Sequence, residues 1–244
     1  MKRFYLSVLF LCSFGSLFAG GPSFAFCDYS QGKVFIQENG EIVWEHKAPD
    51  SNDIWVLPNK NILFTAGKEV LEVSRKNDTI FHYTSESNIF ACQRLKNGNT
   101  FIGECDNGRL LEVSPDGSIV KDVSILPFGV KTGGHAFMRN ARCLDNGHYL
   151  VAHYGGKSVV EYDENGKAVW NIPISGGAHS VIRLPSGNTL VAVTDKDNNP
   201  GVFEYDMAGN IVWSLTNKDL PGTLKFAGGM HYLSDGRLFL TNWV

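Results

Sequence analysis

The sequence has no excess of basic charge and no long hydrophobic run after its first 18 residues. Its 22 Lys and Arg residues are balanced by 25 Asp and Glu residues, which gives a formal net charge of -3 and a pI of about 6.2. Proteins that bind a phosphate backbone carry a clustered positive charge. We therefore expect no nucleic-acid partner, and no transmembrane helix in the mature chain.

Cysteine is scarce, and the usual metal-binding spacings are absent. The five cysteines form no Cys-x-x-Cys pair, and no His-x-x-x-His spacing occurs. We therefore predict no metal site, with a cluster of His135, His153 and His179 as the weaker alternative. Cys27, Cys92, Cys105 and Cys143 each lie in a strand-like run, which favours buried free thiols and leaves disulfides as the other possibility.

The N-terminus differs from the rest of the chain. Lys2 and Arg3 precede an apolar run from Leu6 to Phe18, which is too short to span a bilayer as a stable anchor. Small residues follow it from position 19. This pattern predicts a secretory signal peptide over residues 1–19, with cleavage between 19 and 25, and hence an exported protein of the periplasm or cell surface.

What the chain has in abundance is a repeated strand-turn-strand unit. Its anchoring leucines stand at positions 57, 95, 144, 184 and 233, at intervals of 38, 49, 40 and 49 residues. After each of the first four copies comes a second hairpin, such as the one that begins with Val159-Val160-Glu161-Tyr162. Four strands per repeat at this period predict an all-β fold, a β-propeller with four-stranded blades in one domain over residues 20–244.

The aromatic residues that close these repeats predict packing between neighbouring sheets. Trp44, Trp170 and Trp213 each follow a turn glycine by four residues, and Phe81 and Lys121 occupy the same place in the other two repeats. A large aromatic ring at this position buries much apolar area. We therefore interpret the three tryptophans as structural.

The two ends of the chain leave the blade number open. Residues 24–28 match the second strand of a repeat, and the segment from Leu233 to Trp243 supplies only the first two strands of another. We favour six blades, the last of them incomplete in this chain. The alternative is five closed blades, in which residues 230–241 join the N-terminal strands near 33–45 and leave no exposed edge.

The candidate site residues come from positions that do not repeat. Glycine pairs precede His135, His179 and His231, and the connections that lead to Leu144 and Leu233 are the longest. Five residues before the anchoring leucine, His179 corresponds to Asn52 and Arg139 in other repeats. We predict ligand binding by a polar set, and catalysis, if any, by three of its members, His179, His135 and Arg139. The full set is Asn52, His135, Arg139, Asn140, His179 and His231.

Two family resemblances accompany these motifs. The Leu-x-x-Gly-Asn-Thr-Leu hairpin and the Glu-Tyr-Asp-x-x-Gly-x-x-Val-Trp segments at 161–170 and 204–213 resemble secreted bacterial PQQ-binding-like (quinoprotein-dehydrogenase-like) propellers. Because the tryptophan docking motif of the quinone enzymes is incomplete here, we expect no PQQ and no other cofactor. The hairpin that begins at His179 is also similar to one in bacterial arylsulfotransferase propellers, a resemblance that implies a nucleophilic His179 assisted by Arg139 and His135.

These features support three hypotheses for function. The first is a secreted, monomeric binding module for a small polar ligand, a saccharide or an anion, or for a protein partner. Trp55, Phe90, Phe137, Tyr154 and Trp243 are its candidate stacking surfaces. The second is a propeller enzyme, arylsulfotransferase-like or lyase-like. The third is a structural surface-layer component.

Overall fold

A computed structural model describes residues 23–127, 129–194, 200–233 and 235–243. The predicted signal segment, residues 1–19, lies outside the described residues. Throughout the described ranges the regular secondary structure is β-strand. Within them no helix has the length and hydropathy needed to cross a membrane.

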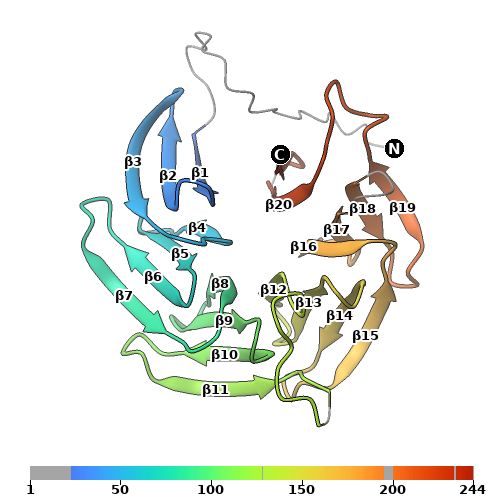
Figure 1. Ribbon diagram of the computed structural model, residues 1–244, viewed down its shortest axis with the longest axis horizontal. Helices are drawn as coiled ribbons and strands as arrows, with labels where there is room; N and C mark the ends of the chain where they lie inside the picture. Colours follow the sequence, from blue (N-terminus) through green and yellow to red (C-terminus); the bar gives the residue numbers. More distant parts are fainter. Residues whose placement is uncertain (1–22, 128, 195–199, 234, 244) are drawn as a thin grey trace. The chain divides into compact units, whose positions relative to one another are not determined.

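The described residues divide into two compact units, one that ends at His135 and one that begins at Ala136, and each is described by itself. The first unit contains three sheets in sequence order: β1-β2-β3, β4-β5-β6-β7 and β8-β9-β10-β11 (Figure 1). Its strands are β1 (Phe24–Asp28), β2 (Lys33–Glu38), β3 (Glu41–Lys47), β4 (Ile54–Val56), β5 (Ile62–Ala66), β6 (Glu69–Val73), β7 (Thr79–Thr84), β8 (Ile89–Arg94), β9 (Thr100–Glu104), β10 (Arg109–Val113) and β11 (Ile119–Ser124).

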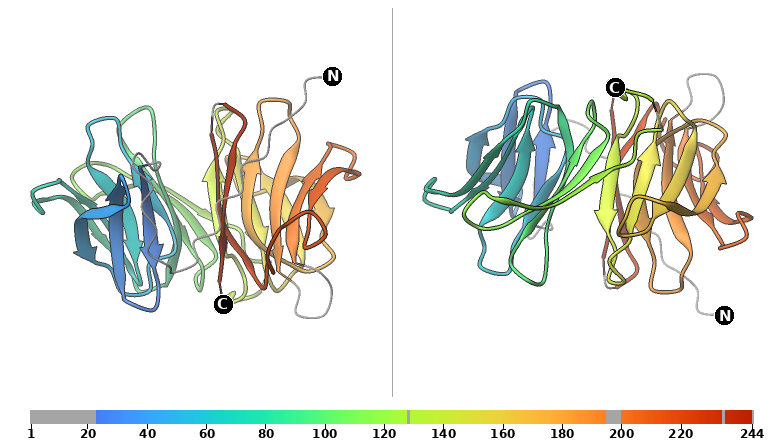
Figure 2. Two further views of the ribbon diagram at one scale, coloured as in Figure 1. Left: turned by 90° about the horizontal axis from the view of Figure 1, so that it is seen from above. Right: turned by 90° about the horizontal axis from the view of Figure 1, so that it is seen from below.

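The second unit contains two four-stranded sheets, β12-β13-β14-β15 and β16-β17-β18-β19, and the two-stranded sheet β20-β21. Seen from the side in Figure 2, its strands run between two faces where the hairpin turns lie. Its strands are β12 (Asn140–Cys143), β13 (Tyr149–His153), β14 (Ser158–Tyr162), β15 (Ala168–Pro173), β16 (Gly177–Arg183), β17 (Thr189–Thr194), β18 (Gly201–Tyr205), β19 (Ile211–Leu215), β20 (Ala227–Tyr232) and β21 (Leu238–Asn242).

The repeated leucine turn has the same backbone geometry in different sheets. The N–H of Leu184 donates to the carbonyl of Asn188 at 2.8 Å, and the N–H of Gly187 donates back to Leu184 at 2.9 Å. The turn needs a positive φ at its third position after the leucine, and Gly187 supplies it at 89°. The equivalent hydrogen bonds recur at Leu57, Leu95, Leu144 and Leu233.

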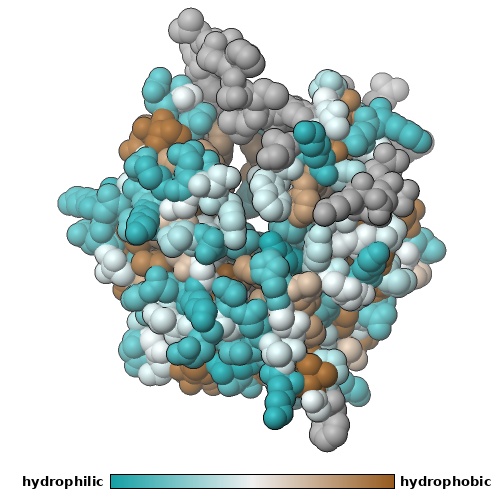
Figure 3. All heavy atoms as spheres, in the orientation of Figure 1, coloured by the Kyte–Doolittle hydropathy of each residue, from teal (hydrophilic) through white to brown (hydrophobic). Residues whose placement is uncertain are grey.

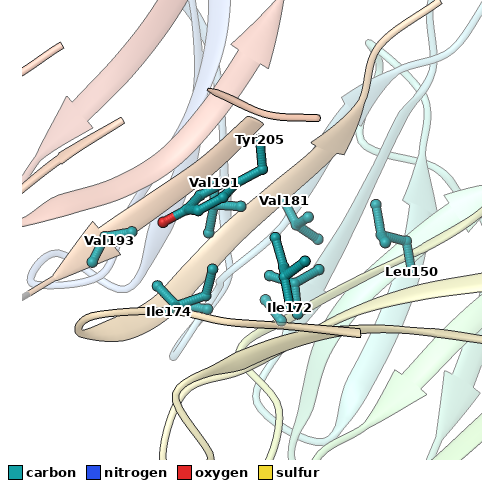
Figure 4. Packing of buried hydrophobic residues seen from close by; sticks show 10 residues of the cluster. Leu150, Ile172, Ile174, Val181, Val191, Val193 and Tyr205 are labelled. Carbon is teal, nitrogen blue, oxygen red and sulfur yellow. The ribbon is translucent and has the colours of Figure 1, made fainter. Parts of the chain in front are cut away.

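The core lies between successive sheets. In the second unit, Leu150 and Ile172 of one sheet pack against Val181, Val191 and Tyr205 of the next (Figure 4). The second strand of each four-stranded sheet is buried along its whole length. These strands are β5, β9, β13 and β17.

The outermost strands of the sheets expose apolar side chains. On β3, Ile42 and Val43 are exposed, and Figure 3 shows hydrophobic surface over this strand. The same pattern recurs on the other closing strands, at Ile80, Ile119, Val120, Val169, Ile211 and Val212.

The predicted fold class is confirmed: the chain is an all-β β-propeller built from four-stranded antiparallel blades. The N-terminal sheet has three strands and starts at the second strand of a blade, as the repeat predicts. β20 and β21 pair with each other as a two-stranded sheet, which fits an incomplete sixth blade.

Candidate functional site

The candidate residues fall into two groups. Asn52 and His135 belong to the unit that ends at His135, and Arg139, Asn140, His179 and His231 belong to the unit that begins at Ala136. We therefore consider the two groups separately.

In the first unit, Asn52 serves the local backbone. Its N–H donates to the Thr65 hydroxyl at 3.0 Å, and its side-chain amide donates to the carbonyl of Asp50 at 2.7 Å. His135 is exposed, and its ring meets Phe90 edge-on, with 5.3 Å between the ring centroids. The carbonyl of His135 accepts a hydrogen bond from the Cys105 thiol.

In the second unit, His179 lies at the centre of a row of aromatic rings. It occupies an irregularity in the pairing of β16 with β17, between Ala178 and Ser180, which turns its side chain away from the regular alternation. Its ring is edge-to-face with Phe226, at 5.0 Å, and with Tyr154, at 6.3 Å. Phe226 in turn meets Trp243 at 5.2 Å. We call Tyr154, His179, Phe226 and Trp243 the ring row.

The ring row runs from buried to exposed surface. The Nδ1 atom of His179 is buried, whereas Trp243 is 58% exposed. Tyr154 and Phe226 are half-buried. A ligand that approaches Trp243 therefore finds aromatic surface next to a histidine side chain.

Burial and a nearby cation keep the His179 imidazole uncharged. Desolvation, followed by the positive charge of Arg139, lowers the pKa of His179 from 6.5 to about 3, and a hydrogen bond with the backbone of Gly228 opposes the shift. The buried Nδ1 atom has no hydrogen-bond partner among the described residues. A neutral imidazole has one acceptor nitrogen, so His179 is suited to accept a hydrogen bond from a ligand and unsuited to act as a general acid.

Close approach explains two of the glycines that precede the histidines. A Cβ added at Gly177 would lie 2.4 Å from the Tyr154 ring, so the ring packs directly on this backbone. A Cβ at Gly228 would lie 2.7 Å from the Thr241 hydroxyl. Gly177 thus permits Tyr154 to pack beside His179, and Gly228 permits the close approach of β20 to β21.

The other candidates of this unit have different surroundings. Asn140 is buried, and its side-chain oxygen accepts the N–H of Val181 at 3.4 Å, which links β12 to β16. His231 is exposed on β20, and its strand neighbour Met230 is buried, because successive side chains of a strand point to opposite faces. Of the predicted set, the structure brings His179 and Arg139 into one electrostatic environment.

His153, the further histidine of the weaker metal hypothesis, is engaged at both ring nitrogens. Nδ1 lies 2.8 Å from the carbonyl of Phe137, and Nε2 lies 2.8 Å from the Tyr162 hydroxyl. Burial lowers its pKa. Over the described ranges, no three His, Cys, Asp or Glu side chains gather in a geometry that could hold a metal ion.

None of the four described cysteines forms a disulfide with another described residue. Cys92 and Cys105 are buried, as the favoured interpretation has it, whereas Cys27 and Cys143 are half-buried. The Ser51 hydroxyl donates to the Cys27 sulfur at 3.1 Å, and burial raises the pKa of this thiol to about 12. Such a thiol is protonated at neutral pH and is a poor nucleophile.

The sequence pointed to His179, Tyr154 and Trp243 but missed Phe226. This phenylalanine lies in the connection between β19 and β20, which has no counterpart in the shorter repeats. No periodic signal therefore marks Phe226.

Comparisons with known proteins place the chain by fold. No known family model matches the sequence, and no curated protein matches it. A solved protein of unknown function from Bacteroides caccae is similar over 90% of this chain and 82% of its own, with a TM-score of 0.79 and 23% identity.

Two lyase structures are also similar. A streptogramin B lyase matches 91% of this chain and 73% of its own, with a TM-score of 0.66 and 15% identity. A catalytically inactive His-to-Ala variant of virginiamycin B lyase from Staphylococcus aureus, solved with quinupristin, matches 92% of this chain and 78% of its own, with a TM-score of 0.62 and 14% identity. At these identities the similarity establishes the β-propeller fold alone.

Proposed function

We propose that the chain is a binding module for a small polar ligand, which it holds at the ring row. The observation that carries this proposal is the buried Nδ1 atom of His179, which has no hydrogen-bond partner among the described residues and belongs to an imidazole held neutral between aromatic rings. A buried polar atom without a partner is costly, and a hydroxyl from a ligand would satisfy it.

The same geometry favours a saccharide over a simple anion. A sugar hydroxyl can donate to Nδ1 or accept from it, whereas sulfate has lone pairs only. The exposed Trp243 ring, packed on Phe226, supplies the apolar surface on which a sugar ring can stack. Arg139 adds a positive charge near His179, which favours a saccharide that also carries a carboxylate.

A thermal-shift screen with neutral sugars, sugar acids and inorganic anions tests the proposal. We expect a sugar or sugar acid to raise the melting temperature of the wild type and of His82→Ala, because His82 is exposed and pairs with Glu69 in the other unit. The same compound should leave the melting temperature of His179→Ala unchanged. An equal shift in His179→Ala, or no shift with any sugar, would overturn the proposal.

A second candidate is a lyase reaction at the same place. It is favoured by the two similar lyase structures, one of them described as inactive after a histidine was replaced by alanine. Here the uncharged His179 would accept a proton, although a pKa of about 3 makes it a weak base. Incubation with quinupristin followed by mass spectrometry separates the two candidates: cleavage by the wild type and not by His179→Ala supports the lyase, and intact substrate rejects it for this compound.

We also propose that the protein is exported and acts as a monomer. Residues 1–19 carry the signal-like pattern that supports export. N-terminal sequencing of protein recovered from the periplasm or medium should give a start between residues 20 and 26. A full-length chain that stays in the cytoplasm would contradict this.

A further inference from the structure

An arginine clasp recurs between neighbouring blades. In the second unit, Arg183 of β16 pairs with Glu161 of β14 at 2.6 Å, and its guanidinium lies 4.6 Å from the centroid of the Trp170 ring. In the first unit, Arg94 of β8 pairs with Glu72 of β6 at 2.6 Å and lies 5.3 Å from the Phe81 ring. Each clasp thus consists of a glutamate, the aromatic residue opposite it on the closing strand, and an arginine from the next blade.

The glutamate oxygens are shared in the same way in both clasps. One oxygen of Glu161 contacts His148 at 2.7 Å, and the other receives Arg183. One oxygen of Glu72 accepts the Asn61 amide at 2.6 Å, and the other receives Arg94. In both clasps, therefore, one glutamate oxygen binds within its own blade and the other binds the guanidinium of the next blade.

The blade formed by β16–β19 has this receptor without its arginine. Glu204 is paired with Trp213 across the sheet, and one of its oxygens accepts the Asn188 amide at 2.7 Å. The position one residue before the anchoring leucine, which holds Arg94 and Arg183 elsewhere, is Tyr232 in the next strand. Tyr232 packs against the apolar cluster around Leu238 and Met230.

Trp213, which follows Glu204 on the closing strand, is exposed. It is 37% exposed, whereas the clasped Phe81 is 5% exposed, and no cation of the described residues lies over its ring. This departs from the sequence interpretation, which gave all three closing tryptophans a buried packing role. The blade of β8–β11 shows the contrast: Glu112 is opposite Lys121 in its own sheet, so a cation already faces that carboxylate.

We propose that Glu204 and Trp213 form a binding site for the guanidinium group of an arginine side chain on a protein partner. The planar guanidinium donates to a carboxylate oxygen while it stacks on an aromatic ring, as Arg183 does within this chain. A lysine ammonium is more strongly hydrated and lacks the planar face, so it fits this receptor less well. This site lies on β18 and β19 and does not include the residues of the ring row.

Titration with N-acetylarginine amide, followed by the indole N–H signals of the 15N-labelled protein, tests the proposal. The Trp213 signal is assigned by its loss in Trp213→Phe. It should shift to a plateau as the arginine probe is added. The affinity for N-acetyllysine amide, measured by the same shift, should be at least about tenfold lower. The Trp170 signal should stay in place, because Arg183 already covers that ring.

Two glutamate variants complete the test. Glu204→Gln keeps the shape of the side chain and should weaken binding of the arginine probe about tenfold, the effect of losing one charge-assisted hydrogen bond. Glu112→Gln, the matched change in another blade, should leave the affinity unchanged. A Trp213 signal that does not move, equal affinities for the two probes, or undiminished binding in Glu204→Gln would each overturn the proposal.

Discussion

At the scale of single residues, the surroundings of His179 matter more than its residue type. The chain contains other histidines that are exposed, such as His82 and His231, and one, His153, whose two ring nitrogens are both engaged. His179 alone among these combines a buried nitrogen without a partner, two aromatic walls and a nearby arginine charge. That combination sets both its charge and its hydrogen-bonding capacity.

The depressed pKa of His179 predicts a pH dependence of stability. Between about 3, the folded pKa, and the ordinary 6.5, the unfolded chain binds a proton that the folded chain does not. The free energy of unfolding should therefore decrease as the pH falls through this window. Above the window, the contribution of the neutral His179 to the free energy of unfolding is fully present. In His179→Gln we expect this slope to be smaller by up to about 1.4 kcal/mol per pH unit.

Urea denaturation of both proteins between pH 7 and pH 4 measures the two slopes. The carboxylates and His153 titrate in both proteins, so the difference isolates His179. Parallel curves would show that His179 is not held neutral by the fold.

Gly177 is predicted to be intolerant of any side chain. In Gly177→Ala the new methyl group would displace the Tyr154 ring from its position beside His179, and overpacking of this kind costs about 1–3 kcal/mol. Gly229→Ala is the control, because its nearest contact would be an ordinary 3.5 Å. Equal losses of unfolding free energy in the two variants would contradict the prediction.

Single residues could be predicted where they depart from the repeat. The sequence singled out His179 because its counterparts in other repeats, such as Asn52 and Arg139, are of different types. It also proposed Asn140 as a ligand-binding residue, but it did not indicate that the buried Asn140 side chain accepts the N–H of Val181 from the next blade. A contact between blades is set by packing distance in space, so a single repeat does not display it.

At the scale of elements, the blades could be predicted almost strand by strand. The leucine turn can be recognised in the sequence because it has glycine, such as Gly98 or Gly187, at the position that needs a positive φ. The exposure of Trp213 could not be predicted in this way. The next blade presents Arg183 beside Trp170 and has Tyr232 in the corresponding position for Trp213, and a single repeat does not display which residue its neighbour presents.

The complete clasp predicts a large effect on stability. Arg183→Leu would leave the nearly buried carboxylate of Glu161 without its cation, which we expect to cost about 2–4 kcal/mol of unfolding free energy. The double variant with Glu161→Leu should recover part of this loss, because the uncompensated charge is removed as well. Denaturant titration of the wild type, both single variants and the double variant measures the coupling.

Arg237→Leu provides the control for the clasp. Its pair with Asp235 spans 2.7 Å, but both side chains are about half exposed, so solvent screens the interaction. We expect little change in stability. A loss in Arg183→Leu no greater than that in Arg237→Leu would show that the clasp does not stabilise the blades.

At the scale of the whole molecule, the chain is organised as two compact units, and the boundary between them lies within the long connection from β11 to β12. This connection runs from the end of β11 at Ser124 to the start of β12 at Asn140. Its length was visible in the sequence as one of the two long intervals between anchoring leucines. The division into units was not, because the repeat continues on both sides of it.

Limited proteolysis should report this organisation. Lys131 lies exposed in the connection, whereas Lys60 and Lys96 lie in hydrogen-bonded hairpin turns. We expect trypsin to cleave after Lys131 faster than after either of the other two, because cleavage requires local unfolding of the turns. Mass spectrometry of early digests identifies the cut, and Lys131→Gln should slow it. Earlier cleavage at Lys60 or Lys96 would contradict the prediction.

The sheet topology has a consequence for how the chain acquires its structure. Every sheet pairs strands that follow one another in sequence, from β1-β2-β3 through to β20-β21. Loops between paired strands are therefore short, and little chain entropy is lost before the first hydrogen bonds form. A hairpin such as β16-β17 can appear as soon as its own few residues are free to meet, so folding can advance from one end of the polypeptide while the rest is still extended.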